Sequence, residues 1–282
     1  MSTSRLRTHV RITWCPGCGN FVIMRAFTRA IVELGLKVKD IVVVTGIGCH
    51  GRLHEYLRLN SFHTIHGRVL PLAMGIKLAN KNLIVVGFSG DGDAYSIGLS
   101  HFIHAARRNI DVKYIVHDNM VFGLTKGQAS PTSPLGLRTK STPKGNILKP
   151  INPIALALIA GATFVARGFT GDMEHLVNVF KQALLHRGFA FIDILQHCVT
   201  FYNVLPELKN RVYRLEDRQH DPSNFSEAVD RALELPNQIP IGVFYKVRRP
   251  TFEEQIPQLK GKPMNLRDVN IDKILKLLET YA

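Results

Sequence analysis

The chain has 282 residues, 45% of them hydrophobic, which is enough to bury a full core in one large domain or in one domain with an appendage. It has no run of about 18 apolar residues that could cross a membrane, and its first residues are polar and basic, without the apolar core of a signal peptide. We therefore expect a cytoplasmic protein with no membrane partner. The formal net charge of +14 favours acidic partners, but no helix-turn-helix or RNP motif accompanies it, so nucleic acid is not the expected one.

Apolar, β-branched runs alternate with amphipathic stretches along most of the chain. The runs at residues 41–45, 83–88, 112–116 and 189–195 predict buried strands. Helices are predicted at residues 21–34, 70–79, 94–107, 153–160 and 173–186. This alternation predicts an α/β fold with a doubly wound, mostly parallel sheet.

Two segments depart from this alternation. Residues 123–150 are rich in Gly, Pro, Ser, Thr and Lys and are too long for an ordinary connection, which indicates a functional loop. After residue 200 the chain becomes polar and proline-rich, with a predicted helix at 225–235, a strand at 241–245 and a terminal helix at 271–281. We therefore divide the chain into an α/β domain at 1–200 and a C-terminal appendage at 201–282.

The chain has four cysteines, Cys15, Cys18, Cys49 and Cys198. Disulfides are uncommon in the cytoplasm, so four cysteines suggest metal or redox chemistry. Four thiolates suit Zn²⁺ or an iron–sulfur cluster alike, and only a folded domain could bring these four together. Structural zinc sites usually combine two close pairs, whereas only Cys15 and Cys18 are close here. Zinc is therefore the weaker alternative, and buried, unliganded cysteines are a third.

Glycine and polar residues follow the predicted strands, at the edge where open parallel sheets bind ligands. The segments are 46–50, 90–93 and 117–119, with Cys198 after the fourth strand. Gly90 and Gly92 would let the backbone approach a phosphate, while Asp91 and Asn119 offer oxygen ligands that suit Mg²⁺. Ordinary turns contain the same residue types, but the matching positions of Asp91 and Asn119 favour a metal site.

The segment Gly90-Asp91-Gly92 followed by Asn119 resembles the thiamine diphosphate signature. Four further segments are similar to the β subunit of the 2-oxoacid:ferredoxin oxidoreductases: Cys15-Pro16-Gly17-Cys18-Gly19, Gly46-Ile47-Gly48-Cys49, the loop at 123–132, and Cys198-Val199-Thr200-Phe201. The resemblance covers roughly residues 10 to 205, with its motifs in order. It implies a sheet of the thiamine diphosphate-binding type.

The resemblance also implies the cofactors and their ligands. Thiamine diphosphate would contact Ile47, Gly48, Cys49, His50, Gly90, Gly92, Asp93, Gly123 and Leu124. Mg²⁺ would bind to Asp91, Asn119 and the carbonyl of Val121, and a [4Fe-4S] cluster would bind to Cys15, Cys18, Cys49 and Cys198. Cys49 would then join the two cofactors within one loop.

The implied activity is the decarboxylation of a 2-oxoacid, such as pyruvate, with coenzyme A to give acyl-CoA and CO₂, while electrons pass through the cluster to ferredoxin. The candidate catalytic residues are Lys126, His50, His66 and Arg68, and Arg52 is a further candidate for binding anionic groups of the substrates. The alternative interpretation is an exposed loop lysine and histidines with structural roles.

One component of thiamine chemistry has no candidate in this chain. Glu33 and Glu55 are the only glutamates before residue 174, and neither lies in a pattern suited to activating the aminopyrimidine ring. Glutamates are usually solvated at the protein surface, which is the simpler role for both. We therefore expect a partner α subunit to supply this carboxylate and the isolated chain to be inactive.

Two other functions stay open at this point. A cluster-free thiamine-dependent decarboxylase subunit would use Asp91 and Asn119 but would leave the four cysteines without a role. A zinc-bearing, basic nucleic-acid-binding protein would use the cysteines and the charge of +14 but would leave the Gly-Asp-Gly segment unexplained.

Overall fold

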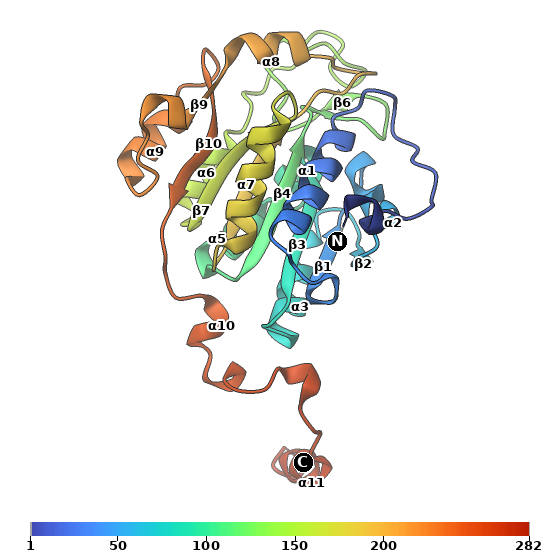
Figure 1. Cartoon of the computed structure of the whole chain (residues 1–282), viewed down its shortest axis with the longest axis vertical. Helices are drawn as coiled ribbons and strands as arrows, with labels where there is room; N and C mark the ends of the chain where they lie inside the picture. Colours follow the sequence, from blue (N-terminus) through green and yellow to red (C-terminus); the bar gives the residue numbers. More distant parts are fainter. Residues whose placement is uncertain (1, 282) are drawn as a thin grey trace.

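The computed structural model describes residues 2–281 and contains one large sheet (Figure 1). The strands are β1 (Ile41–Thr45), β2 (Asn60–His63), β3 (Ile84–Gly90), β4 (Val112–Asp118), β5 (Val121–Phe122), β6 (Gln128–Ala129), β7 (Phe164–Phe169), β8 (Ala190–Leu195), β9 (Val212–Arg214) and β10 (Ile239–Lys246). Eight of them form the sheet in the order β2-β1-β3-β4-β8-β7-β10-β9, and β5 pairs with β6 in a separate hairpin. Strands β2 to β7 in this order are all parallel, which confirms the predicted fold class.

Helices cover both faces of this sheet. They are α1 (Asn20–Glu33), α2 (Leu53–Tyr56), α3 (Val69–Ala79), α4 (Asp91–Tyr95), α5 (Leu99–Arg108), α6 (Pro153–Ile159), α7 (Met173–Leu185), α8 (Leu205–Arg211), α9 (Phe225–Ala232), α10 (Phe252–Gln255) and α11 (Ile271–Glu279). Helices α1 and α7 bury their apolar stripes in one core, and α3, α5, α6 and α9 do so in another. The strands are buried on both sides, as their continuous apolar runs require.

Polar side chains start several helices. Asp172 accepts a hydrogen bond from the backbone N–H of His175 at the start of α7 (3.2 Å), and Asn152 accepts one from Ala155 at the start of α6 (3.2 Å). Each cap satisfies a donor that the first turn of a helix leaves free. Pro153 then occupies the first turn of α6, where its missing N–H costs nothing.

The order of the strands reverses between β1 and β3. From β1, one neighbour is β2 and the other is β3, and all three strands run in the same direction. In a doubly wound sheet, a crevice opens beyond the carboxyl ends of strands at such a reversal. The segments that follow β1 and β3 therefore lie where a ligand site is expected.

The structure also corrects the sequence-based prediction. The single helix predicted at 94–107 is two helices, α4 and α5, separated at residues 96–98. The close turn between them requires glycine at residue 98, because a Cβ there would lie 2.6 Å from the carbonyl oxygen of Asp93. Strands β2 and β7 and helix α8 were not predicted, and the helices predicted at 21–34, 70–79, 153–160 and 173–186 are confirmed to within a few residues.

The C-terminal third contributes to the same sheet and then leaves it. Strand β10 pairs antiparallel with β7, and β9 pairs with β10, which means that residues after 200 extend the large sheet. The division of the chain into two domains at residue 200 stays a prediction. Beyond the sheet, residues 264–281 form an exposed arm that ends in α11 (Figure 1). Within residues 2–281, none of the helices combines the length and apolarity that a membrane crossing requires.

Candidate functional site

A cavity of about 100 Å³ opens at the carboxyl edge of the sheet, beside the strand reversal. The loops after β1, β3 and β4 and the β5–β6 hairpin form its walls. It is lined by Ile47, Gly48, Cys49, His50, His66, Gly90, Asp91, Gly92, Asp93, Asn119, Val121, Gly123 and Leu124, all of which were candidates from the sequence. His117, Phe122, Thr125 and Gln196 also line it and were given no role in the sequence analysis.

Several polar atoms of this cavity are buried without a partner. They are Nε2 of His50, Nε2 of His117, Oδ2 of Asp93 and Oε1 of Gln196. Buried polar atoms in folded proteins nearly always have a hydrogen-bond partner, and each unmet one costs stability. Their convergence on one cavity indicates a site that receives a polar ligand.

The two histidines are uncharged at neutral pH. Burial lowers the pKa of His50 to about 3 and that of His117 to about 3. Nδ1 of His117 lies 2.9 Å from Oδ1 of Asn20, which fixes the orientation of that ring. Both side chains can therefore donate or accept a hydrogen bond, but neither contributes a positive charge to the site.

Asp93 links the cavity to the start of α3. Its Oδ1 accepts a hydrogen bond from the backbone N–H of Gly67 (2.6 Å) and lies 2.7 Å from Nδ1 of His66. Its Oδ2 is 3.9 Å from Nε2 of His50, too far for a hydrogen bond. Asp93 thus orients His66 while it leaves one oxygen free toward the cavity.

Asp91 and Asn119 lie on neighbouring strand ends, as expected for residues that follow β3 and β4. Oδ2 of Asp91 accepts a hydrogen bond of 3.0 Å from Thr132, whose Oγ also lies 2.7 Å from Oδ1 of Asp118. Burial raises the pKa of Asp91 to about 6, and hydrogen bonds from Ser130 and Thr132 oppose that rise. A divalent cation would balance the negative charge of an ionised Asp91. The side-chain oxygens of Asp91 and Asn119 are ligands of the type that Mg²⁺ prefers.

Two glycines of this segment have no room for a side chain. A Cβ at residue 92 would lie 2.2 Å from the ring of Phe122, and one at residue 90 would lie 2.9 Å from Nδ1 of His50. The backbone of the Gly-Asp-Gly segment is therefore in contact with the aromatic rings on both sides. This packing brings the carboxylate between them to the cavity wall.

The four thiols lie near one another, and Cys49 among them lines the same cavity. A Cβ at Gly123 would lie 3.7 Å from Sγ of Cys49 and 3.9 Å from Sγ of Cys198, and Thr200 donates a hydrogen bond to Sγ of Cys15 (3.3 Å). Burial, together with the three other thiols, raises the pKa of Cys18 to about 11. Burial, Cys198 and Cys15 likewise raise the pKa of Cys49.

Hydrogen bonds join the three loops that carry these cysteines. Trp14 donates from Nε1 to the carbonyl oxygen of Cys49 (2.6 Å), and Nε2 of His197 lies 2.9 Å from the carbonyl oxygen of Gly17. The backbone N–H of Cys18 donates to the carbonyl of Cys15 (3.0 Å) in a turn that Gly17 completes with φ of 82°. The loops are thus held in one arrangement by contacts outside the thiols.

Within residues 2–281, no three His, Cys, Asp or Glu side chains converge closely enough to hold one metal ion. An iron–sulfur cluster separates its four thiolates by more than a single ion does, and four thiols on adjoining loops are the donor set that it needs. The thiols therefore fit such a cluster by their chemistry. The expected Mg²⁺ ligands contain a single carboxylate, that of Asp91, beside amide and carbonyl oxygens, so they would not form a group of three such side chains.

Three other candidates lie outside the cavity. Lys126 is exposed in the turn of the β5–β6 hairpin, next to Thr125, which lines the cavity. Arg68 is half-buried at the start of α3. Arg52 pairs with Glu55 (2.9 Å) on the surface, and Glu33 pairs with Lys181 (2.9 Å), so neither glutamate reaches the site.

Comparison with known proteins identifies the family. Residues 46–194 match the family described as thiamine pyrophosphate enzyme, C-terminal TPP binding domain, and residues 198–261 match the family that describes the C-terminal part of the pyruvate ferredoxin oxidoreductase beta subunit. The chain is 48% identical over 260 residues to the 2-oxoacid:ferredoxin oxidoreductase subunit beta of Saccharolobus solfataricus, covering 87% of this chain and 85% of that one. The chain belongs to the 2-oxoacid:ferredoxin oxidoreductase β-subunit family. The resemblance proposed from the sequence is thereby confirmed.

Further relatives agree with this assignment. The chain is 38% identical over 250 residues to a 2-oxoglutarate synthase subunit of Methanocaldococcus jannaschii, covering 88% of this chain and 93% of that one. A solved 2-oxoglutarate:ferredoxin oxidoreductase from Magnetococcus marinus, with 2-oxoglutarate, coenzyme A and succinyl-CoA bound, superposes with a TM-score of 0.91 at 34% identity, covering 98% of this chain and 96% of that one. Membership in this family places the chain among thiamine-dependent oxidoreductases rather than among nucleic-acid-binding proteins.

Proposed function

We propose that this chain binds thiamine diphosphate, Mg²⁺ and a [4Fe-4S] cluster, and that with an α subunit it converts a 2-oxoacid and coenzyme A to acyl-CoA and CO₂. Electrons from this reaction would leave through the cluster to ferredoxin. The relatives named above act on 2-oxoacids as a class or on 2-oxoglutarate, which supports the substrate class without selecting its member.

The observation that carries this proposal is the position of Gly123. A Cβ at this residue would lie 3.6 Å from Nδ2 of Asn119 as well as beside the Sγ atoms of Cys49 and Cys198. Asn119 of the proposed Mg²⁺ site and the thiols of Cys49 and Cys198 therefore surround the same stretch of backbone. Electrons released at the cofactor would have only a short distance to travel to the thiols.

The residues of the chain divide the work of holding the cofactors. Asp91, Asn119 and the carbonyl of Val121 would bind Mg²⁺ and, through it, the diphosphate. When bound, thiamine diphosphate supplies the nucleophilic carbon and the electron sink that 2-oxoacid decarboxylation requires, and an iron–sulfur cluster accepts single electrons. Neutral His50 would donate or accept a hydrogen bond at the wall, and Phe122 with Leu124 would exclude water.

Lys126, His66 and Arg68 are proposed to bind the substrates. Asp93 orients His66 toward the cavity, and Lys126 lies on the hairpin that forms one wall. A flexible ammonium on this exposed turn suits an anionic carboxylate that enters from solvent. The 2-oxoacid and coenzyme A both carry such anionic groups.

The need for an α subunit follows from what the cavity lacks. Among the described residues that line it, the carboxylates are Asp91, the proposed Mg²⁺ ligand, and Asp93, whose Oδ1 is held by His66 and Gly67 and whose Oδ2 alone is free. Its volume of about 100 Å³ is also below the roughly 300–1,000 Å³ of sites that enclose a whole ligand. A second subunit would cover the rest of the cofactor and supply the activating carboxylate, and the β-subunit names of the relatives support this.

The test is anaerobic co-purification with the α subunit, followed by analysis of iron, sulfide, magnesium and thiamine. We expect a brown complex with iron and sulfide near four per β subunit and 2-oxoacid-dependent reduction of ferredoxin. The β chain alone should show no 2-oxoacid decarboxylation. A colourless, zinc-containing complex, or decarboxylation by the single chain, would contradict the proposal.

A further inference from the structure

The N-terminal segment carries three arginines and leads directly to the most exposed thiol, that of Cys15. The first carboxylate side chain of the sequence is Glu33, so Arg5, Arg7 and Arg11 precede the cysteine pair without an acidic neighbour in their segment. All three side chains are exposed. Among the cysteines, Cys15 is exposed and the other three are partly buried.

A fourth arginine joins this segment through the fold. The backbone N–H of Arg58 donates to the carbonyl of Leu6 (2.8 Å), and its Nη2 lies 3.0 Å from Nε2 of His9. We call the exposed side chains of Arg5, Arg7, Arg11 and Arg58 the arginine surface. Val10, between Arg7 and Arg11 in the sequence, is 49% exposed and offers an apolar contact.

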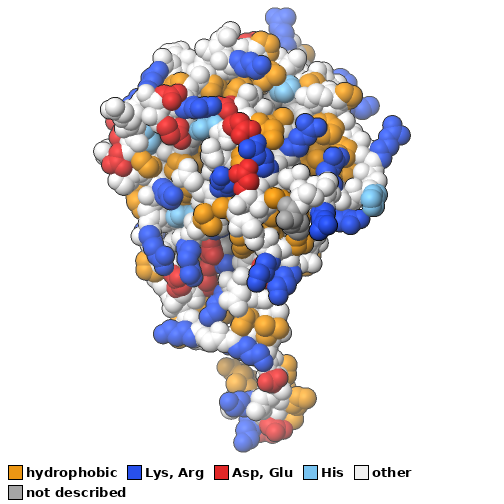
Figure 2. All heavy atoms as spheres, in the orientation of Figure 1, with side chains coloured by type: hydrophobic (Ala, Val, Ile, Leu, Met, Phe, Trp, Pro, Cys, Tyr) orange, Lys and Arg blue, Asp and Glu red, His pale blue; other side chains and the backbone are white. Residues whose placement is uncertain are grey.

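The charges of the arginine surface are not neutralised within the chain. Among residues 2–281, the ion pairs of this chain do not include any of its four guanidinium groups. Surface arginines that have no carboxylate partner keep their full attraction for an acidic protein. Many other lysines and arginines are spread over the molecule (Figure 2), so the pairing of each group matters more than the total charge.

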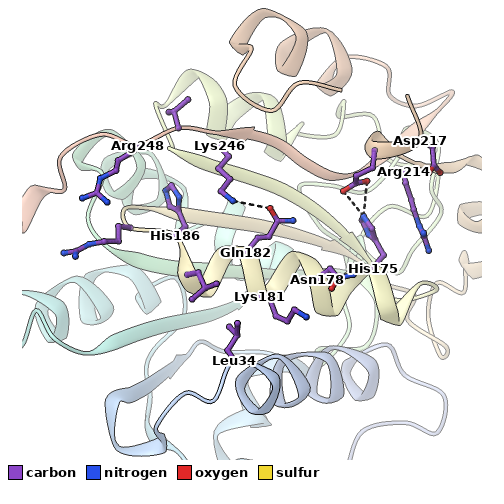
Figure 3. Close-up of a pocket in the computed structure, with 14 residues that line it drawn as sticks. Leu34, His175, Asn178, Lys181, Gln182, His186, Arg214, Asp217, Lys246 and Arg248 are labelled. Atoms are coloured by element: carbon purple, nitrogen blue, oxygen red, sulfur yellow. Dashed lines mark hydrogen bonds and ion pairs between the residues drawn. The ribbon is translucent and has the colours of Figure 1, made fainter. Parts of the chain in front are cut away.

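A second basic region provides the contrast. A groove of about 960 Å³ runs along α7 and the end of β10 (Figure 3). Three of its cations already have carboxylate partners: Lys181 pairs with Glu33 (2.9 Å), Arg214 with Asp172 (2.6 Å) and Arg187 with Glu254 (3.1 Å). None of the four cysteines lines it.

The loop that carries the arginine surface is also fixed relative to the thiols. The backbone N–H of Thr13 donates to the hydroxyl of Tyr56 (3.1 Å), and Trp14 packs edge-on against the same ring, with centroids 4.9 Å apart. Trp14 also donates to the carbonyl of Cys49. A protein bound to the arginines would therefore be held at a defined position beside Cys15.

We propose that the arginine surface is the docking site of the electron acceptor, a small acidic iron–sulfur protein of the ferredoxin class. The inference rests on the proposed function, because it takes the thiols as ligands of a cluster that releases electrons. Electron transfer between proteins weakens steeply with separation, so the acceptor must bind next to the exposed edge of the donor. Arg11 precedes Cys15 by four positions on the loop that Thr13 and Trp14 fix to Tyr56 and Cys49, and the unpaired charge of the arginine surface would attract an acidic partner and orient it.

The experiment uses the complete α–β complex with two acceptors, ferredoxin and a small uncharged redox dye. In the Arg7→Gln/Arg11→Gln variant, we expect the KM for ferredoxin to rise roughly three- to tenfold at low ionic strength. The dependence of that KM on salt should weaken, because fewer charges remain to be screened. Dye reduction should be unchanged, since the dye needs no charged docking surface.

The matched control removes the same number of charges from the groove. In Lys246→Gln/Arg248→Gln, the KM for ferredoxin should stay within twofold of wild type. The inference is wrong if the groove variant alone raises this KM, or if neither variant does. It is also wrong if the arginine variant dissociates from the α subunit on size exclusion, since the surface would then be a subunit interface. A wild-type complex that reduces neither acceptor would instead contradict the proposed function.

Discussion

The cavity at the sheet edge and the groove along α7 differ in size and in how well their polar groups are satisfied. The groove is much larger, about 960 Å³ against about 100 Å³, yet three of its cations are held in ion pairs at the surface. The cavity contains buried imidazole, carboxylate and amide atoms that have no partner. Unmet buried polarity is costly unless a ligand relieves it, so it identifies a binding site better than volume does.

The largest effect that would sharpen this contrast is expected from Asp91→Asn. The variant should lose Mg²⁺-dependent thiamine diphosphate binding, and ferredoxin reduction should fall by roughly a thousandfold, because the carboxylate ligand is removed. Titration calorimetry and turnover assays would measure both. Asp217→Asn, in the groove, is the matched control and should change neither; cofactor binding by the cavity variant would contradict the assignment.

The same substitution should stabilise the cofactor-free chain. Burial raises the pKa of Asp91 to about 6, so the folded state binds its proton more tightly than the unfolded state does. The stability that this group contributes is present at low pH and is lost as the pH rises through about 6. At pH 8, Asp91→Asn should therefore raise the free energy of unfolding by about 1–3 kcal/mol. Urea unfolding would measure this, and a less stable variant would contradict the burial argument.

A mid-sized effect is expected from Lys126→Ala. Loss of the ammonium next to the cavity-lining Thr125 should raise the KM for 2-oxoacids about five- to tenfold, with a smaller change in kcat. Lys140→Ala, an exposed lysine of the same long loop, is the control. Equal KM values for the two variants across several 2-oxoacids would remove Lys126 from the substrate site.

The buried histidines should make the cofactor-free fold sensitive to acid. Burial lowers the pKa of both His50 and His117 to about 3, so below pH 6.5 the unfolded chain gains protons that the folded chain does not. Each histidine should then reduce the free energy of unfolding by up to about 1.4 kcal/mol per pH unit. Urea unfolding between pH 7.5 and 5 should show a shallower fall of the free energy of unfolding for His50→Gln than for wild type, and equal slopes would contradict the burial argument.

The smallest effect is expected from deletion of residues 268–282. The side chains of 268–281 are exposed, so removing them should change the Tm of the chain by less than about 2 °C. Differential scanning calorimetry of the full and shortened chains would test this. A larger loss would mean that the arm contributes to the core.

Much of the fold could be predicted because its signals are local. Strand β1 coincides with the apolar run at 41–45, and Asp91 and Asn119 are found at adjoining strand ends. Strand β7 was missed because Arg167 interrupts its apolar run. That arginine is buried beside Asp193 of the neighbouring strand, whose Oδ2 lies 3.5 Å from its Nε. The edge strand β2, with mostly exposed residues, has no apolar alternation to detect.

The motif residues of the site could be predicted from the sequence, but the hydrogen bonds that hold them in place could not. Thr132 lies 41 residues from Asp91 in the sequence, and Trp14 lies 35 from Cys49, so no spacing rule indicates either hydrogen bond. His117 and Gln196 also follow strands, but a polar residue after a strand is common, and only the shared cavity shows that their free atoms converge. The activating carboxylate is expected on another chain and could not be read from this one.

The central claim is that the Asp91 edge and the four thiols form one electron-transferring site. The most direct test mixes the anaerobic α–β complex with a 2-oxoacid and coenzyme A and follows the visible absorbance of the cluster. The wild-type complex should bleach within turnover time, whereas Asp91→Asn should bleach only with dithionite, because its thiols are intact but its cofactor edge is not. Bleaching of Asp91→Asn by substrate, or a wild-type complex with no cluster absorbance, would contradict the account.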